Sequence, residues 1–320
     1  MPPLAALTAA VRSWHSRNEF TGTVLLNGVI AVVGGTTAVP DEIHVVEKGA
    51  LRKVTGHNES WAKDIAFSKV EDVTFTAKDG TVVNGLLARP ANAPAGKLPT
   101  ILWIHGGPNG QDDHSFDNIR EILAANGYAV LQVNYRGGSG RGSKFQKAIF
   151  ADWGNLEVVD LLAGVDWAVK SGVADPDRLG IGGWSYGGIL TNYTIAQDTR
   201  FKAAASGAGH SYIAANYGHD IYQKWYNWEL GPPWENREAY DRLSPLLQAG
   251  RVTTPTIFLG GREDWNVPLL NAELFYQSLR KRGIPTELIV YPGAHHGGWS
   301  KEFERDYLER VRAWFDRYLK

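Results

Sequence analysis

The sequence predicts an α/β protein built on a mainly parallel, doubly wound sheet with helices on both faces. From about residue 70 onward, short apolar runs alternate with longer helical patterns, and this order is typical of parallel strands joined by crossover helices. One such run, at 178–182, leads through a glycine-flanked turn into a helical segment. The 320 residues are enough for one large domain, or for one domain with an appendage.

Residues 1–66 are expected to form a separate, β-rich segment. Several short strand-like runs at close spacing are typical of all-β structure, and four of them would make one blade of a propeller-like sheet. A single blade cannot close a ring, so its edges would need cover. The four strands are expected at 21–26, 29–33, 42–47 and 51–55.

The α/β domain is expected over residues 67–320. Asp79-Gly80 is a strong hairpin signal between its first two strands. Strands are expected at 71–77, 81–88, 99–105, 128–134, 178–182, 201–206, 256–260 and 287–291. Helices are expected at 116–126, 156–170, 271–282 and 303–319.

An aromatic-rich insertion at 207–250 interrupts this alternation. It would lie above the carboxyl ends of the strands, where α/β proteins bind ligands. Tyr212 and Trp225 in this insertion are therefore candidate substrate contacts. The alternative is a helical bracket whose aromatic side chains only pack against one another.

Composition limits the class of function. Hydrophobic residues make up 43% and charged residues 21%, as in ordinary soluble enzymes. The formal net charge of −1 gives no indication of a nucleic acid or membrane partner. The absence of cysteine excludes disulfides and thiolate metal sites, and it fits a cytoplasmic location. The short apolar segment at 4–11 has no basic residues before it and predicts a helix rather than a signal peptide.

The segment Gly183-Trp184-Ser185-Tyr186-Gly187 has the G-x-S-x-G pattern of a nucleophile elbow. In such an elbow a serine sits in a strained turn between a buried strand and a helix. Side chains at the two glycine positions would collide with the neighbouring strand and helix. We therefore predict that Ser185 is a nucleophile, the alternative being a glycine-rich structural turn.

A serine nucleophile needs a base and an orienting carboxylate, which in α/β-hydrolases follow in the order acid, then histidine. Asp264 follows the strand at 256–260 and is our candidate acid, with Glu263 as the competing carboxylate. His296 lies in a glycine-flanked loop after the last strand and is our candidate base. The adjacent His295 is expected to pack or to support it.

Two backbone amides are expected to form an oxyanion hole. One belongs to Tyr186, directly after the nucleophile, and the other to Gly107 in the sequence His105-Gly-Gly-Pro108. Donors placed in this way stabilise a transition state by roughly 3–4 kcal/mol each. His105 and Trp184 are further candidate substrate contacts. The reaction needs no cofactor and no metal ion.

The loop at 134–142 is rich in glycine but lacks the G-x-x-x-x-G-K-[ST] pattern of a phosphate loop. We interpret it as a sharp turn near the active site. Its arginines, Arg136 and Arg141, either bind a substrate carboxylate or have a solvated or ion-paired role.

Together these motifs resemble the catalytic domain of the prolyl oligopeptidase family (S9 serine peptidases), in the branch of acylaminoacyl and dipeptidyl peptidases. The resemblance runs from about residue 70 to the C-terminus. It implies an α/β-hydrolase fold with Ser185, Asp264 and His296 as nucleophile, acid and base. The matching segments are His105-Gly-Gly-Pro, Asn134-Tyr-Arg-Gly-Gly-Ser-Gly, Asp152-Trp-Gly, Gly183-Trp-Ser-Tyr-Gly-Gly, Glu229-Leu-Gly-Pro-Pro-Trp-Glu, Ser244-Pro, Gly261-Arg-Glu-Asp and Tyr291-Pro-Gly-Ala-His-His-Gly.

The chain departs from the family pattern at three places. Family peptidases usually carry a large β-propeller that covers the site, whereas residues 1–66 leave room for one blade-like remnant. His105 stands where some branches place an oxyanion-binding tyrosine, and Arg141 stands where an aromatic residue is common. The resemblance therefore implies a more open site, or one that another subunit covers.

We expect a carboxylesterase acting on small acyl esters, because the alkoxide of an ester leaves more easily than an amine and an open site lacks propeller contacts that would position a peptide. The alternative is an S9-type peptidase on short peptides. A non-catalytic binding or assembly module is a third, remote interpretation. We also expect a homo-oligomer, because single-blade edges and insertion aromatics would otherwise be exposed.

Overall fold

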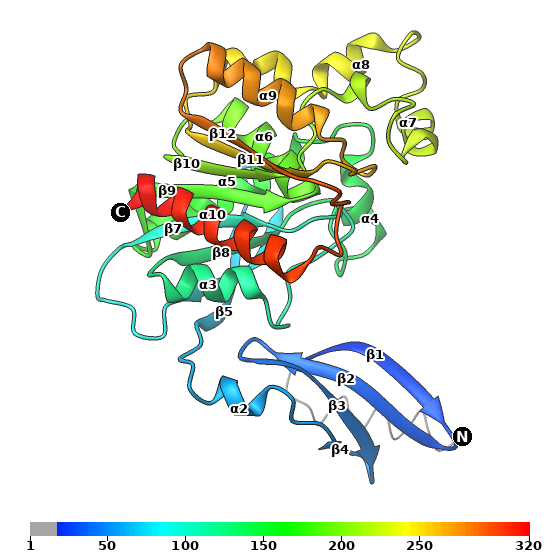
Figure 1. The fold of residues 1–320 in the computed structure, drawn as a ribbon, viewed down its shortest axis with the longest axis vertical. Helices are drawn as coiled ribbons and strands as arrows, with labels where there is room; N and C mark the ends of the chain where they lie inside the picture. Colours follow the sequence, from blue (N-terminus) through cyan, green and yellow to red (C-terminus); the bar gives the residue numbers. More distant parts are fainter. Residues whose placement is uncertain (1–17) are drawn as a thin grey trace.

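The computed structural model describes residues 18–320, which contain two β-sheets of unequal size (Figure 1). The smaller sheet has four strands in the order β1-β2-β3-β4, and the larger has eight in the order β12-β11-β10-β9-β7-β8-β6-β5. The helix expected at 4–11 lies outside the described residues.

The smaller sheet is a simple antiparallel meander. Its strands are β1 (Asn18–Leu26), β2 (Val29–Thr36), β3 (Val39–Glu47) and β4 (Ala50–Lys53). Asn27-Gly28 connects β1 to β2, and Lys48-Gly49 connects β3 to β4. Both residues of each loop have positive φ angles, which is the conformation that two-residue hairpin loops favour. The four strands fall where the sequence predicts them.

A short segment joins this sheet to the larger one. It contains α2 (Glu59–Ala62), and the rings of Trp61 and Phe67 both contact Phe116 in edge-to-face geometry. The backbone N–H and hydroxyl of Ser68 donate hydrogen bonds to the carboxylate of Glu121. The connection is therefore attached to the surface of the larger domain.

The larger sheet has six parallel strands and a two-stranded antiparallel extension. Strands β12, β11, β10, β9, β7 and β8 run parallel, β6 pairs antiparallel with β8, and β5 pairs antiparallel with β6. Their bounds are β5 (Lys69–Thr76), β6 (Val82–Arg89), β7 (Leu98–Ile104), β8 (Ala129–Asn134), β9 (Ala174–Trp184), β10 (Ala203–Gly207), β11 (Thr256–Gly261) and β12 (Thr286–Tyr291).

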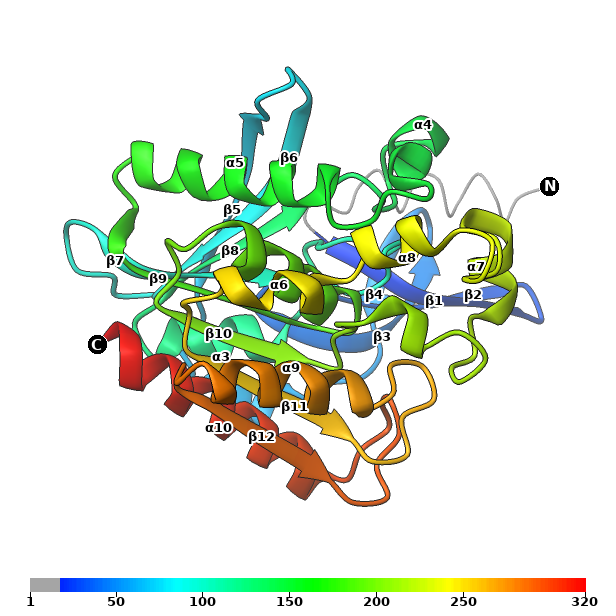
Figure 2. The ribbon, with the colours of Figure 1, turned by 90° about the horizontal axis from the view of Figure 1, so that it is seen from above.

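Helices cover both faces of this sheet (Figures 1 and 2). One face carries α3 (Asn118–Ala125) and α10 (Lys301–Leu319); the other carries α5 (Leu156–Lys170), α6 (Tyr186–Gln197) and α9 (Leu270–Lys281). Asp117 caps α3 by accepting hydrogen bonds from the N–H groups of Ile119 and Arg120. The predicted α/β-hydrolase fold is confirmed, with expected elements within a few residues of their observed bounds.

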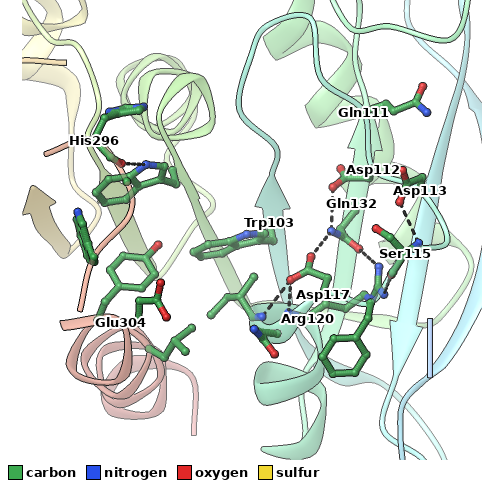
Figure 3. Close-up of a pocket in the computed structure, with 18 of the residues that line it drawn as sticks. Trp103, Gln111, Asp112, Asp113, Ser115, Asp117, Arg120, Gln132, His296 and Glu304 are labelled. Carbon is green, nitrogen blue, oxygen red and sulfur yellow. Dashed lines mark hydrogen bonds between the residues drawn. The ribbon is translucent and has the colours of Figure 1, made fainter. Parts of the chain in front are cut away.

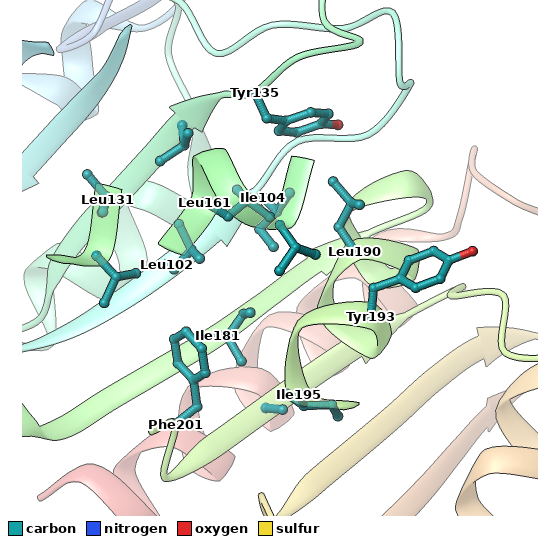
Figure 4. Close-up of a cluster of buried hydrophobic side chains, with 14 of the residues drawn as sticks. Leu102, Ile104, Leu131, Tyr135, Leu161, Ile181, Leu190, Tyr193, Ile195 and Phe201 are labelled. Carbon is teal, nitrogen blue, oxygen red and sulfur yellow. The ribbon is translucent and has the colours of Figure 1, made fainter. Parts of the chain in front are cut away.

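The side chains of the central strands divide the core into two clusters. Along β7, Leu102 and Ile104 point to the face of α5 and α6, whereas Ile101 and Trp103 point to the face of α3 and α10. Figure 4 shows the first cluster, in which Leu161 and Leu190 pack against these strands. A strand that is buried on both faces is apolar along its whole length, which explains why these strands could be predicted from uninterrupted apolar runs in the sequence.

The insertion at 207–250 is helical. It contains α7 (Gln223–Glu229), α8 (Arg237–Arg242) and two 3₁₀ segments (Ile213–Ala215 and Pro245–Arg251) around a small core of its own. Tyr226 and Tyr240 are buried in that core, whereas Trp228 and Trp234 are 73% and 75% exposed. Among the described residues, none of the helices combines the length and apolar character needed to cross a membrane.

Candidate active site

Ser185 occupies a strained turn between β9 and α6. Its φ and ψ angles are 59° and −123°, outside the regions that a serine readily adopts. A Cβ at Gly183 would lie 2.5 Å from the carbonyl oxygen of Ile104, and one at Gly187 would lie 2.0 Å from the same atom. Only glycine fits at these two positions, so the turn has the sterics predicted for a nucleophile elbow.

Ser185, His296 and Asp264 form a hydrogen-bonded chain. His296 Nε2 lies 2.9 Å from Ser185 Oγ, and His296 Nδ1 lies 2.7 Å from Asp264 Oδ2. The other carboxylate oxygen, Asp264 Oδ1, accepts hydrogen bonds from the N–H groups of Asn266 and Val267 at 2.8 and 2.9 Å. Asp264 is 4% exposed, so these contacts fix a buried carboxylate against the imidazole.

The neighbouring residues Glu263 and His295 are not part of this hydrogen-bonded triad. Glu263 is exposed, and its backbone oxygen lies 2.8 Å from Nδ1 of His295. His295 in turn accepts, through its backbone oxygen, a hydrogen bond from the indole of Trp299. These contacts hold the loop before α10, so the geometry favours Asp264 and His296 over their neighbours.

The two candidate amides of the oxyanion hole lie beside Ser185. Tyr186 is the first residue of α6, so its N–H belongs to the helix-terminal donors that have no intrahelical acceptor. A Cβ at Gly106 would lie 3.4 Å from Ser185 Cβ, so the loop after β7 passes directly over the nucleophile. Gly107, in the same loop, lines one cavity together with Ser185 and Tyr186.

This cavity, the serine-side cavity, has a volume of about 60 Å³ and a mostly apolar and aromatic wall. Trp225, a candidate substrate contact from the sequence, lies in this wall, whereas most of the other lining residues were not candidates. His210 is one of these, is 5% exposed, and burial lowers its pKa to about 4, so it is neutral at pH 7. The lining residues are Gly107, Pro108, Trp153, Ser185, Tyr186, Ile189, His210, Ile213, Tyr222, Trp225, Tyr226 and Val267.

The other three predicted substrate contacts do not line the serine-side cavity. His105 stacks on Tyr135 with ring centroids 4.2 Å apart. The indole N–H of Trp184 donates to the backbone oxygen of His296, and its ring contacts Trp299 edge to face. The backbone N–H of Tyr212 donates to Oδ1 of Asn271. These residues shape the loops around the site instead of the wall beside Ser185.

The arginines of the 134–142 loop are paired. Arg136 is 7% exposed and forms ion pairs with Asp160 and Asp79. Arg141 donates to the side-chain oxygen of Asn84 and lies over the ring of Phe145. Of the two interpretations left open by the sequence, the structure supports ion pairing for Arg136.

Glu157 is a buried carboxyl group directly behind the elbow. Its Oε1 accepts hydrogen bonds from the hydroxyl of Tyr186 at 2.7 Å and from the N–H of Gly154 at 3.2 Å, whereas Oε2 has no hydrogen-bond partner among the described residues. Burial raises the pKa of Glu157 from 4.5 to about 7, despite these two donors.

Glu157→Gln is expected to increase the melting temperature relative to wild type more at pH 8 than at pH 5. Between about 4.5 and 7 the folded protein holds a proton that the unfolded chain has released, so stability falls as the pH rises through this window. Glutamine keeps the Oε1 acceptor and carries no charge. Thermal unfolding followed by circular dichroism at both pH values tests this, and an equal difference at the two would contradict it.

The fold and the hydrogen-bonded serine, histidine and aspartate define the class of protein as a serine hydrolase with an α/β-hydrolase fold. The model of the prolyl oligopeptidase family matches residues 114–320. The chain belongs to this family, and the predicted resemblance is confirmed.

Several similar proteins are described as peptidases. The chain is 35% identical over 288 residues to the uncharacterized peptidase YuxL of Bacillus subtilis, covering 88% of this chain and 44% of that protein. The acylaminoacyl peptidase of Pyrococcus horikoshii has a TM-score of 0.88 and 27% identity, over 95% of this chain and 50% of its own. An acylaminoacyl peptidase in complex with Z-Gly-Gly-Phe-chloromethyl ketone has a TM-score of 0.89 at 27% identity, with the same coverage. The chain thus spans about half the length of these relatives.

Proposed function

We propose that this protein is a serine peptidase that cleaves short peptides through an acyl-enzyme. The observation that carries this proposal is the hydrogen-bonded chain from Ser185 through His296 to Asp264. From the sequence, a carboxylesterase is the main expectation and an S9-type peptidase the alternative. The comparisons favour the alternative, because the similar proteins are described as peptidases and one of them holds a peptide chloromethyl ketone.

In this proposal Ser185 Oγ attacks the carbonyl carbon of the scissile bond, and His296 Nε2 accepts its proton. Asp264 stabilises the imidazolium that forms and keeps the ring oriented through the 2.7 Å contact at Nδ1. The N–H groups of Tyr186 and Gly107 donate to the oxyanion. When the intermediate collapses, His296 returns the proton to the departing amine. Water then hydrolyses the acyl-enzyme by the same sequence of proton transfers.

The acyl part of the substrate would enter the serine-side cavity. This cavity reaches the triad at Ser185, and aromatic rings of Tyr222, Trp225 and Tyr226 form part of its wall. Such a wall suits a small apolar side chain on the residue whose carbonyl is attacked.

A comparison of two chromogenic substrates tests the proposal. N-acetyl-alanyl p-nitroanilide is expected to be hydrolysed together with p-nitrophenyl butyrate, with Ser185→Ala as the blank for both. Hydrolysis of the ester without any hydrolysis of anilides or peptides would contradict the peptidase proposal and support the carboxylesterase that the sequence predicts. Absence of Ser185 labelling by a fluorophosphonate would favour the non-catalytic module.

Self-association and a cytoplasmic location stay predictions. Sedimentation at micromolar concentration is expected to give a mass above the 35.2 kDa of one chain. A monomeric mass would contradict the prediction of a homo-oligomer.

A further inference from the structure

A second and larger cavity, the histidine-side cavity, has a volume of about 590 Å³ (Figure 3). It reaches the triad at His296, whereas the serine-side cavity reaches it at Ser185. In acyl transfer the histidine delivers the proton to the departing amine, so the leaving group must lie beside His296. The histidine-side cavity is therefore placed where a leaving group would extend.

Carboxylates stand on two opposing walls of this cavity. Asp112, Asp113 and Asp117 come from the loop before α3, and Glu304 comes from the first turn of α10 on the other side (Figure 3). Asp113 accepts a hydrogen bond from the N–H of Ser115, and Glu304 is exposed. The cavity thus presents carboxylates on both sides of any group that enters it.

Only part of this negative charge is balanced within the cavity wall. Of the described residues that line the cavity, Arg120 is the one Lys or Arg; it is 1% exposed, pairs with Glu121 at 3.7 Å, and donates hydrogen bonds to Gln132 Oε1 and the backbone oxygen of Ser115. Asp112 Oδ2 is shielded from solvent and has no hydrogen-bond partner among the described residues. Burial, and then the nearby charge of Asp117, raise the pKa of Asp112. A cation that enters the cavity would relieve this repulsion through space.

Aromatic rings complete the wall between the two sets of carboxylates. Trp103 lies between them (Figure 3). Trp184, Trp299 and Tyr307 also line the cavity, and the ring of Trp184 contacts His296, Trp299 and Tyr307. Aromatic faces pack against the methylene stem of a long side chain and attract its cationic end. An elongated organic cation matches this combination of aromatic and acidic surface better than an anion or a purely apolar group.

We propose that the histidine-side cavity is a leaving-group subsite that selects a basic residue, lysine or arginine, immediately after the scissile bond. This inference rests on the proposed function, because it concerns the amine that departs when Ser185 is acylated. It adds a substrate preference that the serine-side cavity does not determine.

The experiment compares peptides that differ only in the leaving group. N-acetyl-alanyl-lysinamide, the corresponding norleucinamide and the glutamic acid amide are incubated with the full chain, and release of the amine is followed by chromatography. We expect kcat/KM for the lysine peptide to exceed that for the norleucine peptide by about fivefold or more, and the ratio to fall at high salt. The glutamate peptide is expected to be the poorest of the three.

Two isosteric substitutions localise the effect. In the double variant Asp113→Asn/Glu304→Gln, asparagine keeps the acceptor for the Ser115 N–H, and the lysine-to-norleucine ratio is expected to fall toward one. Glu309→Gln is the matched control, since Glu309 is exposed on the same helix, pairs with Arg305 and does not line the cavity. It should keep the wild-type ratio. A wild-type ratio near one, or an unchanged ratio in the double variant, would overturn the proposal.

A second measurement separates this inference from the proposed function. With p-nitrophenyl acetate as acyl donor, lysinamide and norleucinamide compete with water for the acyl-enzyme, and the amide formed reports how well each amine occupies the leaving-group side. If peptides are not cleaved but lysinamide is acylated preferentially, the peptidase proposal fails and the subsite stands. If peptides are cleaved without preference and both amines react equally, the subsite proposal is contradicted and the peptidase proposal stands.

Discussion

Ser185→Ala is expected to lower kcat for any acyl substrate by about 10⁵- to 10⁶-fold, because the covalent route disappears and only binding and the oxyanion hole remain. The melting temperature should change little. The hydroxyl accepts or donates one hydrogen bond, to His296, and alanine meets the same backbone strain at φ 59°. We therefore expect a folded protein with almost no activity. Hydrolysis of p-nitrophenyl butyrate measures the activity, and thermal unfolding measures the melting temperature.

Ser206→Ala supplies a control for this loss. Ser206 is buried at the end of β10, the strand next to β9, and donates a long hydrogen bond of 3.3 Å to the backbone oxygen of Gly188. Its removal should cost about 1 kcal/mol of stability and leave kcat within a few-fold of wild type. Residual Ser185→Ala activity close to wild type would mean that another residue is the nucleophile.

The backbone framework around the site could be predicted from the sequence because its signals are local. Apolar runs buried on both faces identify the strands, and Gly183 and Gly187 identify the elbow through a steric requirement that no other residue meets. The order of serine, acid and histidine then follows from the positions after β9, β11 and β12. Each of these features depends mainly on residues that are close together along the chain.

The side chains that face substrate could not be predicted in the same way. Trp184 is adjacent to Ser185 in the sequence, yet its ring turns away from the serine-side cavity toward Tyr307 and Trp299 and lines the histidine-side cavity. His210 and Val267 line the serine-side cavity from two distant segments, and no local pattern marks them. Side-chain direction at a loop depends on tertiary packing, so Trp225 was identified from aromatic composition while its neighbours in space were not.

The expectation of an esterase had a different weakness. It relied on the easier departure of an alkoxide and on the absence of a propeller, and not on a feature of the site. The histidine-side cavity is lined by residues from the segments 103–132 and 296–308 and by Trp184, all within the α/β domain, so its wall does not depend on a propeller. In the proposed leaving-group subsite, the positioning of the amine would come from this domain itself, and the argument against amide substrates would no longer apply.

Asp264→Asn is expected to lower kcat/KM by about 10⁴-fold while the fold is retained. Asparagine Oδ1 can still accept the N–H groups of Asn266 and Val267, so the loop keeps its shape. The amide nitrogen then takes the place of Oδ2 beside His296 Nδ1 and donates a hydrogen bond to it. Nδ1 must act as an acceptor, and the proton moves to Nε2.

That tautomer explains the size of the expected loss. Nε2 lies 2.9 Å from Ser185 Oγ and, once protonated, cannot remove the serine proton. Glu263→Gln is the matched control, because Glu263 is exposed and contacts His295 only through its backbone oxygen. It should retain activity within a few-fold. Initial rates of both variants on one substrate test which carboxylate is the acid of the triad. A large loss of activity in Glu263→Gln together with a small loss in Asp264→Asn would assign that role to Glu263 instead of Asp264. The distances favour the opposite outcome, since only Asp264 reaches the imidazole.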